Sequence, residues 1–339
     1  MSAKPRLHIN LLPGFFTASQ LQKSWARLDN LAEVSRSEVH TAEDIDPFLK
    51  NLDAILMWAW PKPTPAQLDR LGNRYKFSAH LDLAQSHAKS LIERGITVST
   101  SRSGFSPAVA EMALTLILAS LRRTSTYHAD MWKATETDAH WLKRFPEDID
   151  PRERQLTGRR VGIIGFGRVG QRLGELLKPF QCQVSIVDPF LPDAVAEKAG
   201  VRKVSLETLA SDCEIIVLSA ASNSGTQHLI NQSIISRLQP DAVFVNVARA
   251  ALVDTEALVN RLRRGDLFAA IDVFDKEPLA KDSVLRSLPN AYLTPHRAGG
   301  IMESVQRNID WLIDDYEAFL KGQPLKYRVS EAMIPSLDA

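Results

Sequence analysis

Short apolar runs alternate with amphipathic stretches along the first third of the chain. The apolar runs predict buried strands at residues 6–12, 53–58, 75–78 and 96–99. Apolar residues at helical spacing predict helices over 21–31 and 84–94. Thr64 followed by Pro65 fits the cap and the first position of another helix. This alternation of strand and helix is what a parallel sheet covered by helices requires.

A longer helix and then a polar stretch come next. Ser106 followed by Pro107 indicates a helix start, and apolar residues continue to Leu121. From residue 124 to residue 156 the sequence is polar. Three aromatic residues are scattered in it, namely Trp132, Trp141 and Phe145. Such a segment fits an arm that packs on a second subunit, and it fits a local cap within the chain equally well.

The rest of the chain repeats the strand and helix pattern. Apolar runs predict strands at 161–164, 184–187, 214–219, 242–247, 267–272 and 291–293. A last amphipathic helix over 304–320 is expected to return to the first domain. We therefore predict a doubly wound nucleotide-binding domain over 106–298, and a discontinuous domain formed by 1–105 and 299–330.

A glycine motif opens the predicted nucleotide-binding sheet. The residues expected to bind the cofactor there are Gly165, Gly167, Arg168, Val169 and Gly170. In such a unit the first glycine permits the turn, the second lets a pyrophosphate approach the backbone, and the third lets helix and strand pack closely. A glycine-rich turn without a ligand is the simpler alternative. The complete series of strand, turn, helix, second strand and terminal carboxylate favours dinucleotide binding.

The terminal carboxylate of this series is Asp188, at the end of the second apolar run. A carboxylate there can accept hydrogen bonds from both ribose hydroxyls of NAD, and it repels the 2′-phosphate of NADP. The next residues, Pro189 and Phe190, are neutral and offer no cation to a 2′-phosphate. The sequence therefore predicts that NAD is preferred to NADP.

Composition narrows the class of partner. Of the 339 residues, 41 are basic and 40 acidic, and the net charge of +1 gives no overall field that would attract nucleic acid or a membrane surface. A small-molecule partner is expected. Cys182 and Cys213 are interpreted as reduced core thiols, with neither a disulfide nor a metal site. We expect a cytoplasmic protein, because Pro13 interrupts the apolar N-terminal run and the apolar run 112–121 is too short to span a bilayer.

Three segments at the ends of the late strands carry candidate chemistry. They contain Arg249, then Asp272 and Glu277, and then His296. The mid-chain glycine motif, the segment Asn-Val-Ala-Arg, Glu277-Pro278 and Thr294-Pro295-His296 follow one another in the order and approximate spacing of a known family. On these motifs the chain resembles the D-2-hydroxyacid dehydrogenase family, and the resemblance covers nearly the whole chain.

The resemblance implies an α/β fold of two doubly wound parallel-sheet domains, with a Rossmann-type coenzyme domain inserted in a smaller flavodoxin-like substrate domain. It implies that Arg249 binds the substrate carboxylate and carbonyl, that Glu277 pairs with the histidine, and that His296 is the acid/base. Ala248 and Asp272 would belong to the cofactor site, where Asp272 supports either the site or the nicotinamide carboxamide. A homodimer is also expected.

These residue types suit the implied chemistry. A forked guanidinium holds two oxygens of a 2-hydroxy or 2-keto acid at once. Imidazole exchanges protons near neutral pH, and a carboxylate beside it fixes its tautomer. Taken singly, each residue has a simpler explanation: a strand-end histidine is often structural, Arg249 could pair with Asp254, and Glu277 could lie in a solvated turn. The ordered set favours catalytic roles.

Three places depart from the family pattern. Residues 78–84 contain no glycine, whereas the family has a glycine-rich loop whose amides hold the substrate carboxylate. Residues 219–226 lack the usual proline-containing pattern, and Ala250 replaces a common glycine. These changes leave the cofactor motif and the Arg-Glu-His set intact, but the resemblance does not name the substrate. Trp58 and Trp60 are expected either to line the substrate side of the site or to pack in the core.

The first hypothesis is an NAD-dependent oxidoreductase that interconverts a small 2-hydroxy acid, of D configuration, and its 2-keto acid. The second is an NAD(H)-sensing interaction protein similar to the transcriptional corepressors of this fold family. The charge of +1 and the lack of an evident peptide-docking extension make the second hypothesis weaker. Formate oxidation is disfavoured, because that branch of the family has glutamine where Glu277 stands. A turnover assay separates these hypotheses.

Overall fold

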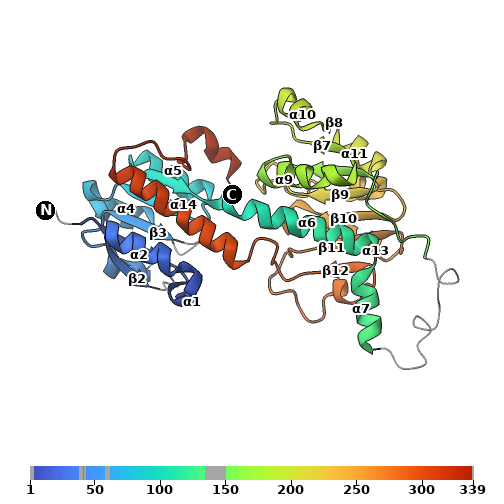
Figure 1. Ribbon diagram of the computed structural model, residues 1–339, viewed down its shortest axis with the longest axis horizontal. Coiled ribbons are helices and arrows are strands. Elements are labelled where there is room, and N and C mark those ends of the chain that lie inside the picture. The colour runs from blue at the N-terminus through green and yellow to red at the C-terminus, as the bar shows by residue number, and fades with distance from the viewer. Residues whose placement is uncertain (1–3, 38–40, 42, 58–61, 134–149, 338–339) are drawn as a thin grey trace. The chain divides into compact units, whose positions relative to one another are not determined.

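The structure is a computed structural model that describes residues 4–37, 41, 43–57, 62–133 and 150–337. The chain divides into two compact units, Met1–Phe105 with Gly300–Ala339, and Ser106–Gly299. Figure 1 shows the blue N-terminal part and the red C-terminal part together in the first unit. We expected the discontinuous domain to end at residue 330. The tail beyond it still belongs to the first unit, where Nε2 of Gln85 donates to the carbonyl of Leu337 at 2.7 Å.

The first unit contains a five-stranded parallel sheet in the order β2-β1-β3-β4-β5. Its strands are β1 (Arg6–Asn10), β2 (Glu33–Ser37), β3 (Ala54–Met57), β4 (Phe77–His80) and β5 (Thr97–Thr100). In the register, Leu7 of β1 lies between Val34 and Ala54. This order is that of flavodoxin-like sheets, so the predicted fold class of this unit is confirmed.

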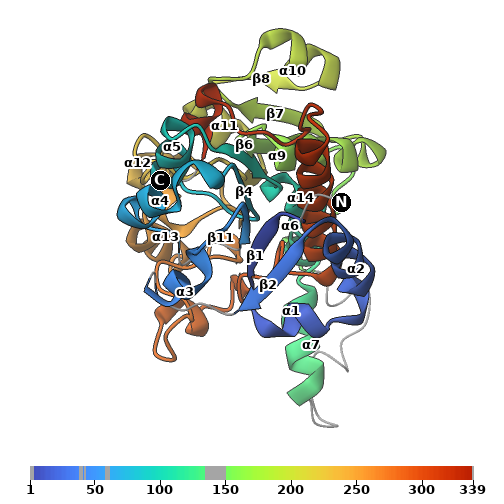
Figure 2. The ribbon, with the colours of Figure 1, turned by 90° about the vertical axis from the view of Figure 1, so that its left-hand side faces the viewer.

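Helices cover both faces of this sheet, and Figure 2 shows α2 and α14 on one face and α3, α4 and α5 on the other. The α-helices are α1 (Pro13–Thr17), α2 (Gln22–Leu31), α3 (Asp46–Leu49), α4 (Pro65–Leu71), α5 (Gln85–Glu93) and α14 (Met302–Leu320). Short 3-10 helices are η1 (Ser19–Leu21), η2 (Glu43–Ile45), η3 (Gly72–Arg74), η4 (Arg102–Phe105) and η8 (Glu331–Ser336). The predicted cap of α4 is confirmed, because Thr64 and Gln67 exchange hydrogen bonds as a capping box.

The second unit contains a seven-stranded parallel sheet in the order β12-β11-β10-β9-β6-β7-β8. Its strands are β6 (Arg160–Ile164), β7 (Gln183–Val187), β8 (Arg202–Lys203), β9 (Ile215–Leu218), β10 (Ala242–Asn246), β11 (Leu267–Ile271) and β12 (Ala291–Leu293). Counted from β6, this is the doubly wound order of the Rossmann fold, with the crossover between β6 and β9. The predicted Rossmann-type domain is therefore confirmed.

The helices of the second unit pack on both faces of its sheet. They are α6 (Ser106–Leu121), α7 (Thr124–Lys133), α9 (Arg168–Leu177), α10 (Asp193–Ala199), α11 (Leu206–Asp212), α12 (Gln232–Arg237) and α13 (Thr255–Leu262), with 3-10 helices η5 (Lys178–Phe180), η6 (Ala250–Leu252) and η7 (Val284–Ser287). By length and composition alone, the helical stretch Arg102–Leu121 could cross a membrane. In the structure Leu116, Ile117 and Leu121 are buried in the core of the second unit, beside Val161 and Leu173.

The polar stretch after α6 begins as helix α7, and its Trp132 is 82% exposed. Trp141 and Phe145 of this stretch lie outside the described residues, as do Trp58 and Trp60. Before β6 the amide of Arg154 donates to the carbonyl of Leu121, the last residue of α6, at 3.0 Å.

Candidate active site and cofactor site

The glycine turn after β6 has the space that a dinucleotide requires. Gly165 has φ +86°, and a Cβ there would lie 2.4 Å from Cα of Ala220. A Cβ on Gly170 would lie 2.4 Å from the carbonyl oxygen of Gly165. At Gly167 a Cβ would meet nothing within 4 Å. The first and third glycines are therefore needed for backbone packing, while the second leaves an open surface that a pyrophosphate could approach.

Helix α9 begins at this open surface. Arg168 and Val169 form its first positions, and its N-cap residue Gly167 supplies no side-chain cap. The first backbone N–H groups of the helix therefore have no acceptor within the helix, and the positive end of the helix dipole favours an anion there. The turn itself is braced from β9, because Oγ of Ser219 donates to the carbonyl of Gly165 at 2.7 Å.

Asp188 follows β7 directly and faces the glycine turn. Its Oδ2 accepts from the amide of Phe166 at 2.8 Å, and its Oδ1 accepts from the amide of Phe190 at 3.0 Å. Phe190 is 92% exposed. The structure thus brings the predicted ribose carboxylate to the predicted pyrophosphate turn, and together they fit one dinucleotide.

The loop after β10 carries Arg249. Asn246, the last residue of β10, accepts from the amide of Ala248 at 3.0 Å and donates from Nδ2 to the carbonyl of Arg249 at 3.2 Å. The guanidinium of Arg249 donates to the carbonyl of Ala248 at 2.8 Å. Asp254, which could have paired with Arg249, accepts from the amide of Ala257 at 3.0 Å and so caps α13.

The segment after β12 carries His296, and Asp272 holds it in place. The carboxylate of Asp272 is fully buried and accepts from Oγ1 of Thr294 at 2.6 Å and from the amides of Arg297 and Ala298 at 2.9 and 2.8 Å. The amide of His296 donates to the carbonyl of Asp272 at 2.8 Å. Three donors of the protein already occupy its carboxylate, which favours the supporting role among the two predicted for Asp272.

Glu277 and His296 form a direct pair. Nδ1 of His296 donates to Oε2 of Glu277 at 2.7 Å, and Oε1 of Glu277 accepts from the amide of Phe274 at 3.0 Å. The two side chains are 45% and 36% exposed, so a small molecule can reach them. His296 has φ +51°, a left-handed conformation that is uncommon outside glycine and often occurs at functional sites.

Glu277 keeps its negative charge. Desolvation by burial raises the pKa of Glu277. The hydrogen bonds from His296 and Phe274, together with the charges of His296 and Arg249, lower this pKa by more, so it lies below the usual value. An ionised Glu277 accepts the proton on Nδ1 of His296 and leaves Nε2 free to serve a substrate oxygen. The charge of Arg249 acts on the same carboxylate, so the three predicted catalytic residues influence one another electrostatically.

The family model described as D-isomer specific 2-hydroxyacid dehydrogenase, NAD binding domain, matches residues 114–298. The chain belongs to this family. A relative in Bacillus subtilis (strain 168), whose name places it among the 2-hydroxyacid dehydrogenases, is 36% identical over 69% of this chain and 64% of its own. The glyoxylate reductase of Thermofilum pendens (strain DSM 2475 / Hrk 5) is 30% identical over 87% of this chain and 88% of its own.

The match to a solved structure of this family covers both units of the chain. The 2-hydroxyacid dehydrogenase of Ketogulonicigenium vulgare Y25 shares 26% sequence identity and a TM-score of 0.79, and the match covers 97% of this chain and 99% of that one. Several relatives are longer than this chain. The match covers 57% of the D-3-phosphoglycerate dehydrogenase of Methanocaldococcus jannaschii and 44% of that of Archaeoglobus fulgidus.

Two of the three departures from the D-2-hydroxyacid dehydrogenase pattern have local explanations. Ser78 and His80 belong to β4 and are buried, and Nε2 of His80 is hydrogen-bonded to Oγ of Ser78 at 2.7 Å, so the expected substrate loop starts only at Leu81, three residues later. The loop 219–226 is folded by its own bonds, because Thr226 Oγ1 donates to the carbonyl of Ala221 at 2.9 Å and accepts from the amide of Asn223 at 2.8 Å. Ala250 begins η6, and nothing in the structure explains the absence of glycine there.

Two groups that support the candidate site were not among the predicted site residues. Asn246 ties together the loop that carries Arg249, and the amide of Phe274 holds Glu277. Asn246 is visible in the sequence as the first residue of the Asn-x-x-Arg segment, which could have marked it. The amide of Phe274 has no side-chain signal, since any residue at this position supplies the same donor.

Proposed function

We propose that the chain is an NAD-dependent oxidoreductase that interconverts a small 2-hydroxy acid, of D configuration, and its 2-keto acid. The observation that carries the proposal is the hydrogen-bonded pair of Glu277 and His296. Glu277 follows β11 and His296 follows β12, and both strands belong to the sheet in which β6 leads into the glycine turn. Ligands of open α/β sheets bind at these carboxyl ends of the strands. An acid/base pair and a dinucleotide turn therefore lie at the same edge of one sheet.

Two groups of residues hold different parts of the cofactor. Gly165, Gly167 and Gly170, with the amides of Arg168 and Val169, take the pyrophosphate at the start of α9, and Asp188 takes the ribose hydroxyls. The backbone of Ala248 lies at the end of β10 beside Arg249 and borders the site. The open surface at Gly167 supports this assignment.

NAD, when bound, accepts or supplies the hydride at substrate C2. Nε2 of His296 gives a proton to the substrate oxygen in reduction and removes it in oxidation, while Glu277 holds the imidazole through Nδ1. The guanidinium of Arg249 binds the substrate carboxylate through parallel hydrogen bonds. Asp272 and Asn246 are positioning residues that keep the two loops in place.

The substrate class follows from the forked guanidinium and from the relatives. Among the relatives are proteins named glyoxylate reductase, hydroxypyruvate reductase and D-3-phosphoglycerate dehydrogenase. The test is NADH consumption against glyoxylate, hydroxypyruvate, pyruvate and longer 2-keto acids. We expect turnover of at least one of them. Tight NADH binding without turnover of any would contradict the proposal and favour the NAD(H)-sensing alternative.

We also propose that the protein is a cytoplasmic homodimer joined through α7. The support is the exposure of Met131 and Trp132 on this helix, with the ring of His128 6.1 Å from that of Trp132. Exposed aromatic residues of this kind are typical of protein interfaces. Sedimentation of the parent and of Trp132→Ala tests this. A parent mass close to the 37.7 kDa of one chain at micromolar concentration would contradict it.

A further inference from the structure

A pocket of about 660 Å³ lies at the amino-terminal ends of β6, β7 and β8 in the NAD-binding domain. Arg160, Gln183 and Arg202, the first residues of these strands, line it. The strands are parallel, so this edge of the sheet is opposite to the edge that carries the glycine turn and the Glu277–His296 pair. The pocket is therefore separate from the proposed cofactor and substrate sites.

Arg160 is fixed at one side of this pocket. Its Nε donates to the carbonyl of Asp212 at 2.7 Å, and Nε2 of Gln239 donates to the neighbouring carbonyl of Ser211 at 2.7 Å. These side chains satisfy the last carbonyl groups of α11, which a helix end otherwise leaves unpaired. Among the described residues, Nη1 of Arg160 has no hydrogen-bond partner. The guanidinium is thus held in one orientation while part of its donor capacity is unused.

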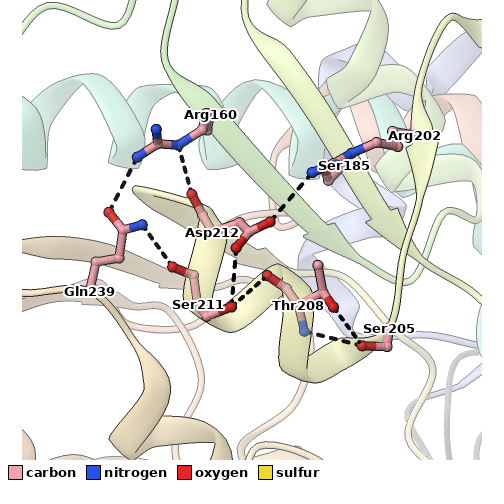
Figure 3. Close-up of polar contacts among 8 residues, drawn as sticks. All are labelled: Arg160, Ser185, Arg202, Ser205, Thr208, Ser211, Asp212 and Gln239. Carbon is pink, nitrogen blue, oxygen red and sulfur yellow. Dashed lines mark hydrogen bonds and ion pairs between the residues drawn. The ribbon is translucent and has the colours of Figure 1, made fainter.

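Arg202 lies on the other side of Asp212, as Figure 3 shows, and it is held loosely. Its Nε and Nη2 are both 3.4 Å from Oγ of Ser185, and Nη2 is 3.6 Å from Oδ2 of Asp212. Its side chain is 63% exposed and that of Asp212 is 44% exposed. All these contacts are longer than the hydrogen bonds that a guanidinium makes to a bound carboxylate or phosphate.

The floor of the pocket adds no negative charge. Cys213 is buried there, and desolvation raises the pKa of its thiol to about 11 despite the opposing charges of Arg202 and Arg160. Both guanidinium groups are therefore within electrostatic reach of this one thiol. Asp212 is the only acidic side chain among the described lining residues, so the lining itself carries a net positive charge. Glu214, outside the lining, is 3.8 Å from Nη2 of Arg160, and its closer partner is Nη1 of Arg159 at 2.8 Å.

We propose that this pocket binds a small oxyanion, the carboxylate or phosphate group of a ligand, between the guanidinium groups of Arg160 and Arg202. Arg160 offers a fixed fork, and Arg202 can exchange its long contacts for short ones. Asp212 competes for Arg202. Among the described residues, the only other donor to its carboxylate is Oγ of Ser211, at 3.2 Å. The carboxylate can therefore leave Arg202 and be hydrated when the anion binds.

The two cysteines give a local test, because Cys182 and Cys213 are the only cysteines of the chain and both line this pocket. Burial raises the pKa of both thiols to about 11, and Cys213 is buried, so the reporter is the partly exposed Cys182. Its alkylation by iodoacetamide at alkaline pH is followed by peptide mass. An excess of NAD fills the cofactor's phosphate site throughout. The probes are inorganic phosphate and succinate at millimolar concentration. We expect one of them to slow alkylation saturably, which also identifies the anionic group, and the absence of protection by both would overturn the proposal.

Two variants with opposite expected effects sharpen this test. Arg202→Gln should raise the anion concentration for half protection by about tenfold or more, because it removes a charge-assisted fork. Asp212→Asn should lower that concentration, because it removes the competing carboxylate. Arg172→Gln, at an exposed position of α9, is the matched control and should behave as the parent. Parent-like protection in Arg202→Gln would overturn the proposal, and the assay does not depend on turnover of any keto acid.

Discussion

Histidines lie in opposite environments in the two domains. In the NAD-binding domain His296 is exposed and bonded to an ionised glutamate. In the first domain His8, His80 and His87 are buried, and desolvation lowers the pKa of His8 to about 4, that of His87 to about 3 and that of His80 well below its usual value. The same residue type is therefore suited to acid/base chemistry only where a carboxylate and solvent access accompany it, which is why we propose that role for His296 alone among these four.

The partners of these histidines explain the difference. The ring nitrogens of His8 are 2.9 and 3.0 Å from the hydroxyls of Ser35 and Ser37, so it joins β1 to the edge strand β2. His80 is bonded to Ser78 within the sheet. At His8 neutral hydroxyls satisfy both ring nitrogens without stabilising the charged form of the imidazole. Nδ1 of His80 and Nε2 of His87 are buried without a hydrogen-bond partner among the described residues, which also disfavours the charged form. A histidine at a strand end is thus a weak signal until its partner is known.

The largest expected effect is loss of turnover in His296→Ala. General acid/base catalysis contributes about 10²–10⁴-fold, so turnover should fall by that factor in both directions. NADH affinity, measured by fluorescence, should remain near the parent value, because the cofactor is held at the glycine turn and Asp188. His128→Ala, which removes an exposed histidine of the same domain, is the control and should keep parent turnover. Near-normal turnover by His296→Ala would remove this histidine from the mechanism.

A smaller effect is expected at Asp188. Asp188→Asn should weaken NADH binding by about tenfold, because a charge-assisted hydrogen bond to the ribose is lost. It should also reduce the preference over NADPH, since the repulsion of the 2′-phosphate disappears. Values of kcat/KM with both cofactors test this in the parent and the variant. Equal or better use of NADPH by the parent would contradict the assignment of Asp188.

The smallest effect on activity, and a clear effect on stability, is expected from the buried histidines. The folded-state pKa of His8 lies below its unfolded value, so the unfolded chain takes up a proton that the folded protein does not. The contribution of neutral His8 to the free energy of unfolding is therefore fully present above pH 6.5 and is lost as the pH drops toward about 4. The loss from His8 amounts to about 3 kcal/mol.

Denaturant unfolding of the parent and of His8→Gln between neutral and acidic pH measures this contribution. The variant should lose stability less steeply on acidification and keep parent turnover at neutral pH. An equally steep pH dependence in both proteins would show that His8 is not buried in its neutral form.

Much of the fold could be predicted because its strands are apolar and buried on both faces. The exceptions are edge strands. β2 has the sequence Glu-Val-Ser-Arg-Ser, and β8 has only Arg202 and Lys203, so neither shows an apolar run. Edge strands need charged or polar residues to avoid pairing with other chains, and this hides them from a hydrophobicity pattern. At β4, Tyr75 suggested an early start, but it is buried before the strand and bonds Ser78 through its hydroxyl.

The sequence predicted which residues form the site, but it did not predict the contacts among them. The sequence placed Arg249, Glu277 and His296 at strand ends, and it left two roles open for Asp272. The burial of Asp272 and its three donors favour the supporting role, and these donors come from a segment more than twenty residues away in the chain. Such contacts depend on tertiary packing, so no local pattern in the sequence shows them.

The most direct test of the Glu277–His296 pair is the pH profile of kcat/KM for keto-acid reduction in the parent and in Glu277→Gln. Reduction requires protonated His296, and ionised Glu277 stabilises the imidazolium. In the variant, which keeps the shape but removes the charge, reductive activity should be lost at a lower pH than in the parent. Glu256→Gln, at an exposed position of α13, should show the parent profile. An unshifted profile for Glu277→Gln would contradict the account.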